Sequence, residues 1–181
     1  MRGAHMSIQV PTRREAKLEK PSPIQDGRVA LELFGSDDAF DETIAFMRLL
    51  WALDHGMRSV SKEMRANLGV TGPERLILRM VGLYTRLSPR DLSRLLHLHP
   101  SSLTPALERL VRRGLLARST DPRDGRRAIL ELTIAGRRIN RLRAGTIEAR
   151  VRRALASARR SEVAVASKVL AALAADFEGR W

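Results

Sequence analysis

Hydrophobic residues recur at three- and four-residue steps from Phe40 to Leu68, which is the period of an amphipathic helix. Ser36 precedes this run as a candidate helix cap, and Gly69 follows it as a candidate stop. The pattern predicts a helix of about 30 residues, longer than most helices of globular proteins. Trp51 lies off the main apolar stripe, so we expect the helix to bury a second face against another subunit.

Two capping boxes predict the next helices. Thr71 and Glu74 form the first box, which opens a helix that continues to Leu83. Ser88 and Asp91 form the second box, which opens a short helix over residues 88–97.

A third helix is predicted from about Ser101 to Arg113, with Gly114 as its stop. We expect Pro100 and Pro105 both to lie near its start, because a proline inside a helix removes a hydrogen bond and clashes with the preceding turn.

The apolar period then changes to two, which is typical of strands. Residues 115–118 and 128–132 are predicted to be strands, with Leu130 and Leu132 on one face, and the turn-rich residues 121–127 form the hairpin tip. Thr133 caps a helix that continues to Leu155 with a candidate bend at Gly145, and a last helix follows from residue 161.

The fold class predicted is mainly α with a small β-hairpin wing. Two short helices and a hairpin, over residues 70–132, are the parts of a winged helix-turn-helix. We expect residues 36–69 and 133–181 to form a dimerisation layer. Residues 1–6 (MRGAHM) look like an expression-vector remnant, and the rest of segment 1–35 is expected to be an extended arm.

Composition narrows the class of protein. The 181 residues are 44% hydrophobic and 29% charged, which describes a globular protein. The chain has no cysteine, which excludes thiolate catalysis and zinc fingers. No apolar run approaches the roughly 20 residues that span a bilayer, and the amino terminus has no apolar secretion segment. We therefore expect a cytoplasmic protein with no membrane partner.

The charge is concentrated in one part of the chain. The net charge is +13, and residues 101–160 carry 16 arginines against five acidic residues, a net of +11. A focused basic region of this kind is typical of a site for a polyanion. A solvated arginine-rich face is the alternative interpretation.

The predicted third helix and the hairpin tip carry the candidate DNA contacts. Hydroxyl side chains and backbone N–H groups at the helix start suit phosphates or base edges, while arginines suit guanine and the minor groove. In the hairpin, Asp124 is expected to hold the Arg126 guanidinium in a forked ion pair. The candidate residues are Ser101, Ser102, Thr104, Pro105, Arg109, Arg112, Arg123, Asp124, Arg126 and Arg127.

Residues 87–138 resemble the MarR (multiple antibiotic resistance regulator) family of bacterial transcription factors. Gly125 stands where that family often has another arginine, and Pro105 is an unusual choice in the recognition helix. The resemblance rests on Ser101-Ser102-Leu103-Thr104, Leu110, Arg113-Gly114-Leu115, Asp121-Pro122, Asp124-Gly125-Arg126, Leu132-Thr133 and Gly136.

The resemblance implies a homodimer that binds a pseudo-palindromic operator, with recognition helices about 34 Å apart. It also implies a repressor that a small, often aromatic or phenolic, ligand releases from DNA. We expect Trp51, His55 and Arg58 to face the ligand cleft, although ordinary interface residues are an equal interpretation.

Other functions are less well supported. His55, His97 and His99 have poor spacing for a metal site, so no metal or other cofactor is expected. The Ser101-Ser102 pair has no glycine-flanked elbow or base partner, so an enzyme is not expected. The alternatives are a basic module that binds RNA or chromosomal DNA without sequence preference, and a winged helix that binds another protein.

Overall fold

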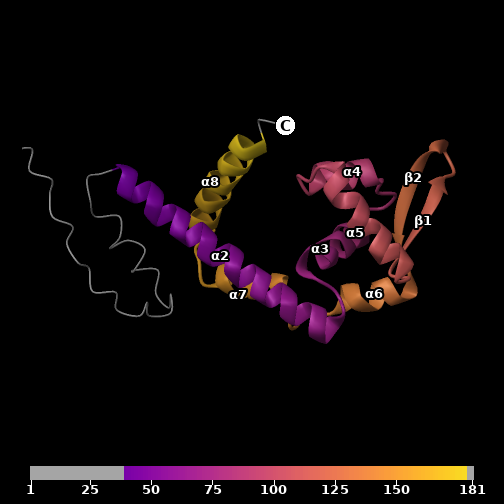
Figure 1. Cartoon of the computed structure of the whole chain (residues 1–181), viewed down its shortest axis with the longest axis horizontal. Coiled ribbons are helices and arrows are strands. Elements are labelled where there is room, and N and C mark those ends of the chain that lie inside the picture. Colours follow the sequence, from indigo (N-terminus) through magenta and orange to yellow (C-terminus); the bar gives the residue numbers. More distant parts are fainter. Residues whose placement is uncertain (1–38, 179–181) are drawn as a thin grey trace, which may run out of the picture. The chain divides into compact units, whose positions relative to one another are not determined.

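A computed structural model describes residues 39–178 of the chain, with side chains from 42 to 177. The expected cap at Ser36 and the arm over residues 1–35 lie outside the described residues. The chain divides into two compact units, residues 1–50 and 51–181. Helix α2 (Ala39–Leu68) begins in the first unit, and every later element belongs to the second (Figure 1).

Helix α2 ends as predicted. Gly69 follows its last residue with a φ of 72°, a left-handed conformation that glycine adopts without a steric cost. The helix therefore has the length of about eight turns that the apolar spacing indicates.

Helix α3 (Gly72–Leu83) begins at the predicted capping box. The Thr71 hydroxyl accepts a hydrogen bond from the Glu74 amide at 3.3 Å, and the Glu74 carboxylate accepts one from the Thr71 amide at 3.0 Å. Helix α4 (Pro89–Leu95) begins at the second predicted box, in which Ser88 and Asp91 exchange the same pair of bonds. Both boxes satisfy amides that the first turn of a helix leaves free.

Helix α5 (Pro100–Arg112) has the predicted extent but not the predicted proline placement. Pro105 lies in the second turn rather than near the start, so the Ser101 carbonyl four residues earlier lacks its usual amide partner. Ser101 is exposed, and water can take the place of that partner. The expectation for Pro105 was wrong because a solvent-facing turn tolerates the lost bond.

Strands β1 (Leu116–Asp121) and β2 (Asp124–Leu132) pair in antiparallel register and form the wing. They are longer than predicted from the sequence. Ser119 and Thr120 also pair with β2, and after a register shift Asp121 pairs with Asp124, which leaves residues 122–123 as the turn. Leu130 also donates its amide to the Leu87 carbonyl at 2.9 Å, which joins the wing to the segment between α3 and α4.

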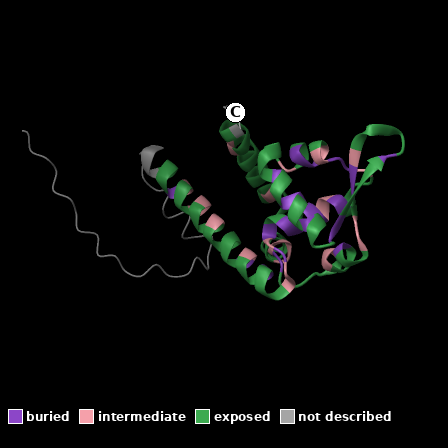
Figure 2. Cartoon of the chain, turned by 45° about the vertical axis from the view of Figure 1, so that its right-hand side comes forward, coloured by how far each residue is buried: buried purple, intermediate pink, exposed green. Residues whose placement is uncertain are grey.

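The wing and helices α3 to α5 enclose one hydrophobic core, which is the main buried region in Figure 2. Gly136, in helix α6 (Ile134–Arg141), packs directly on the start of the wing. A Cβ at this position would lie 2.0 Å from the Leu115 carbonyl oxygen, so only glycine permits the approach. The core residues include Val70, Ile77, Leu78, Val81, Leu87, Leu92, Leu103, Leu107, Leu110, Leu115, Leu116 and Leu130.

The helix predicted from Thr133 to Leu155 is instead two helices, α6 and α7 (Ile147–Ala156). Gly145 has a φ of 67°, which breaks the helical path, and the buried Thr146 caps α7 through a hydrogen bond from the Ala149 amide at 3.2 Å. A glycine followed by a capping threonine ends one helix and starts another, and does not merely bend a continuous helix.

Helix α8 (Arg160–Glu178) ends the described chain and begins one residue before the predicted position. Figure 2 shows α8 largely exposed, and large apolar side chains among its exposed residues include Val165, Leu170 and Phe177. Within residues 39–178, no helix combines the length and the apolar character needed to cross a membrane.

Candidate nucleic-acid interface

Helix α5 separates a buried apolar face from an exposed polar face. Leu103, Ala106, Leu107 and Leu110 are buried in the core. The opposite face presents seven exposed residues: Ser101, Ser102, Thr104, Pro105, Glu108, Arg109 and Arg112. Six of them were predicted as DNA contacts, and the structure brings them together on one surface.

The amino end of this surface is organised by His99. Its Nδ1 accepts a hydrogen bond from the Ser101 amide at 3.3 Å and lies 2.7 Å from the Ser101 hydroxyl. The Thr104 hydroxyl donates to the Pro100 carbonyl at 2.8 Å, so its oxygen remains an acceptor toward solvent. The sequence does not indicate that His99 caps α5, because histidine is not a common cap residue.

Arg109 forms an ion pair within the protein. Its Nε lies 3.4 Å from a carboxylate oxygen of Glu74, and Arg113 approaches the other oxygen at 3.5 Å. Glu74 is buried, and its two arginine partners join the start of α3 to the recognition helix. Arg109 keeps 46% of its side-chain surface exposed, so it can still approach a phosphate.

The buried Glu74 carboxylate is held in its charged form. Burial raises the pKa of Glu74, but hydrogen bonds from the Thr71 backbone, from Arg109 and from the Thr71 hydroxyl, together with the charge of Arg113, lower it further than burial raises it. The net pKa lies below the ordinary value of 4.5, so this anchor persists at neutral pH.

The tip of the wing is shaped by two aspartates. Asp121 accepts a hydrogen bond from the Arg123 amide at 2.9 Å, and Asp124 accepts one from the Arg126 amide at 3.0 Å. The expectation that Asp124 holds the Arg126 guanidinium was wrong, because its carboxylate bonds to the backbone two residues on. Within residues 39–178, Arg123 and Arg126 have no ion-pair partner, and both are exposed.

Two ion pairs hold the wing, one to α4 and the other to the segment between α3 and α4. The Arg127 guanidinium lies 2.5 Å from Asp91, and Arg86 pairs with Asp121. A hydrogen bond from the Ser88 hydroxyl lowers the pKa of Asp91. Burial opposes this effect, but the Ser88 backbone and Arg127 add to it, and the net pKa is lowered. Arg127 therefore fixes the wing and is less available to DNA than Arg123 and Arg126.

A surface hollow of about 940 Å³ lies where α4 meets the start of α5. Arg94 lines this hollow beside Ser101 and Ser102, and it is exposed. Arg94 is not among the DNA contacts predicted from the sequence. It lies four residues after Arg90, which is also exposed, so both residues share one face of α4.

The three candidate ligand residues lie on α2. Trp51, His55 and Arg58 are exposed, and Arg58 forms an ion pair with Asp54 at 2.8 Å. A groove of about 290 Å³ between α2 and α7 is lined by Ala52, Leu53, Gly56, Met57, Val60, Ile147, Arg150, Val151 and Ala154. The candidates thus lie on α2 but outside this groove.

In the part of the chain that the structure describes, no three side chains of His, Asp or Glu are grouped so as to hold a metal ion.

Comparisons with known proteins agree with this geometry. Residues 68–127 match the model of the MarR family. An 88-residue stretch, 49% of this chain, is 30% identical to the organic hydroperoxide resistance transcriptional regulator of Bacillus subtilis and spans 60% of that protein's length.

Solved structures show the same fold. A mutant of Escherichia coli MarR complexed with operator DNA has a TM-score of 0.60 at 24% identity, covering 76% of this chain and 99% of that one. The PcaV transcriptional regulator from Streptomyces coelicolor, in complex with its natural ligand, has a TM-score of 0.59 at 26% identity, covering 77% and 96%. Residues 68–127 therefore match the model of the MarR family, and the described chain has the winged helix-turn-helix fold of these solved regulators.

Proposed function

We propose that this protein is a DNA-binding transcriptional regulator, and not an enzyme, that binds a pseudo-palindromic operator as a homodimer. The observation that carries the proposal is the exposed face of α5, with its hydroxyl groups and Arg112, beside a wing whose Arg123 and Arg126 have no partner among residues 39–178. Such a helix fits the major groove, and such a wing reaches the adjacent minor groove.

The two parts have different roles in binding. Ser102 and Thr104 lie where a recognition helix contacts base edges, so we assign them to sequence reading. Arg112, Arg123 and Arg126 supply contacts to phosphates and to the minor groove. These contacts set the affinity for DNA and its dependence on salt concentration.

Exposed apolar residues in the carboxy-terminal helices support the homodimer. Val151 and Leu155 on α7, and Val165, Leu170 and Phe177 on α8, are all more than 40% exposed. A second copy would cover these faces and would place two recognition helices on successive turns of DNA. We assign Trp51, His55 and Arg58 to this subunit interface, because they are exposed and lie outside the groove between α2 and α7.

We further propose that the protein is a repressor that a small ligand, of aromatic or phenolic type, releases from DNA. The likeness to a regulator solved with its natural ligand supports this part of the proposal.

Footprinting of the DNA upstream of the protein's own gene tests the operator. We expect two protected half-sites whose centres are about 10 base pairs, or a multiple of one helical turn, apart. Uniform protection without discrete half-sites would contradict a homodimer on a pseudo-palindrome and favour a basic module without sequence preference.

A further inference from the structure

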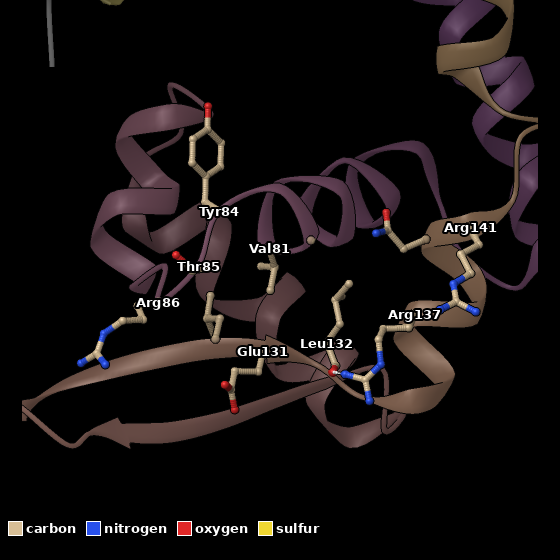
Figure 3. Close-up of a pocket in the computed structure, with 11 residues that line it drawn as sticks. Val81, Tyr84, Thr85, Arg86, Glu131, Leu132, Arg137 and Arg141 are labelled. Carbon is tan, nitrogen blue, oxygen red and sulfur yellow. Dashed lines mark hydrogen bonds between the residues drawn. The ribbon is translucent and has the colours of Figure 1, made fainter.

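The start of helix α5 lines the surface hollow of about 940 Å³ where α4 meets α5. This hollow is separate from the pocket of about 510 Å³ in Figure 3, which is lined by residues of α3, β2, α6 and the segment after α3. His99 lines the hollow beside Ser101 and Ser102, and all three residues are exposed. Because Ser101 and Ser102 are predicted DNA contacts, His99 lies on the same surface of the proposed interface.

The backbone amides at the start of α5 are already bonded within the protein. Pro100 has no N–H group, and the Ser101 amide donates to Nδ1 of His99 at 3.3 Å. The amides of Ser102 and Leu103 donate to the His99 carbonyl oxygen at 2.9 Å and 3.2 Å. Residues 100–103 therefore present no free amide to DNA, and hydrogen-bond donors at this end of the helix must come from side chains.

The contacts with Ser101 place the proton of the His99 ring on its outer nitrogen. A backbone N–H can only donate, so Nδ1, which accepts from the Ser101 amide, carries no proton. The Ser101 hydroxyl, 2.7 Å from Nδ1, donates to the same nitrogen. The proton of the neutral ring is therefore on Nε2, and this N–H has no partner among residues 39–178. The exposed ring thus presents one donor in an orientation that Ser101 holds.

We propose that His99 reads the operator sequence through a hydrogen bond from its Nε2–H to guanine in the major groove. This inference rests on the proposed function. The N-terminal residues of a recognition helix contact base edges, and His99 is the cap residue of α5. Guanine presents N7 and O6 as adjacent acceptors, whereas cytosine presents a donor at the same edge. A ring N–H that can only donate therefore favours guanine over cytosine.

The fixed ring also favours contact with a base. Because Ser101 orients the ring before DNA binds, the side chain loses little conformational freedom when the contact forms. His99 would then add a third sequence-reading side chain to Ser102 and Thr104, at the end of the helix that Thr104 does not reach.

Selection of bound duplexes from a random-sequence library, followed by sequencing, measures the base preference of the full-length protein at each position of a half-site. His99→Asn separates the two roles of this residue, because asparagine is a common cap whose side-chain oxygen accepts an amide, but it lacks the ring nitrogen. We expect the variant to unfold at the same urea concentration as wild type. Its preference for guanine at one position of each half-site should fall by roughly fivefold or more.

His97→Asn, the same substitution two residues earlier, is the matched control. His97 has a φ of 50°, which asparagine tolerates, so the fold should be kept and the base preferences should change by less than roughly twofold. A guanine preference that falls in His97→Asn and not in His99→Asn would assign the donor to the wrong histidine and overturn the proposal.

Two other results for His99→Asn would also overturn the proposal. Unchanged base preferences would mean that His99 only caps α5, and an equal loss of affinity for every sequence would mean that it contacts a phosphate. A wild-type protein that selects no sequence from the library would instead overturn the proposed operator recognition, and this inference with it.

Discussion

The buried Arg75 forms an ion pair with the half-buried Glu148, which joins the winged-helix lobe to the carboxy-terminal helices. The Arg75 Nε donates to Glu148 at 3.0 Å, and only 2% of the Arg75 side chain is exposed. The same guanidinium donates to the carbonyls of Ile139 and Leu142, at the end of α6, with the Leu142 bond at 2.6 Å. One side chain of α3 therefore holds the break between α6 and α7 in place.

Arg75→Met should destabilise the protein by about 3 kcal/mol, because the change leaves Glu148 unpaired and two carbonyls without their donor. The free energy of unfolding is measured in urea at a fixed protomer concentration, since the proposed dimer would make stability depend on concentration. Arg152→Met, at an exposed position of α7, is the control and should change stability by less than about 0.5 kcal/mol. Equal effects of the two changes would refute the structural role of Arg75.

Glu74→Gln should destabilise the protein by about 1 to 3 kcal/mol at pH 7, since it removes the charge that Arg109 and Arg113 share. The pKa of Glu74 is lowered on folding, so its carboxylate stabilises the fold fully above the ordinary value of 4.5 and loses this effect as the pH falls through the lowered pKa. The difference in stability between wild type and variant should therefore shrink below pH 4.5. A difference that stays constant from pH 7 to pH 3 would show that the charge of Glu74 is not the cause.

Arg126→Ala should weaken operator binding and reduce the salt slope of binding by about one, because one phosphate-region contact is lost. The dimer should be unaffected, since Arg126 lies at the wing tip. Arg159→Ala is the control. Arg159 precedes α8 and pairs with Glu162 of that helix, so its replacement should leave DNA affinity unchanged. An Arg126→Ala protein with wild-type affinity and salt slope would count against the wing as a DNA contact.

Thr104→Ala should relax base preference at one operator position, at a cost of about 1 to 3 kcal/mol on the preferred base. Thr104→Ser keeps the hydroxyl and should keep the preference. Binding to a panel of operators with single base changes measures the effect. A uniform loss across the panel would mean that Thr104 positions the helix through its bond to Pro100 and does not read bases.

Deletion of residues 161–181 should convert the dimer to monomer, because it removes the exposed apolar side chains of α8. Sedimentation equilibrium, with circular dichroism to verify that the winged helix remains folded, measures the change. A folded protein that is still a dimer would exclude α8 as the principal interface.

The sequence predicts the features that local chemistry decides. Both capping boxes can be predicted from the sequence, because their partners are only three residues apart. They are Thr71 with Glu74 and Ser88 with Asp91, and each box starts a helix. Gly69 as a stop follows from the same kind of local signal.

The sequence-based predictions are wrong or incomplete where distant residues or solvent determine the local structure. Pro105 is tolerated inside α5 because its turn faces solvent, and β1 extends to Asp121 because residues 119–121 pair with β2 across the hairpin. No pattern along the chain could show that Glu74 meets Arg109, 35 residues later. The part of the site formed by one helix face was therefore predictable, whereas the ion pairs that hold it were not.

The most direct measurement of the central claim is fluorescence anisotropy at two salt concentrations, with the duplex upstream of the protein's own gene and a scrambled duplex of equal length. A sequence-specific regulator should bind the native duplex about a thousandfold more tightly, or better, at both salt concentrations. Equal affinity for the two duplexes, with steep and parallel weakening by salt, would contradict operator recognition and leave only attraction between arginines and phosphates.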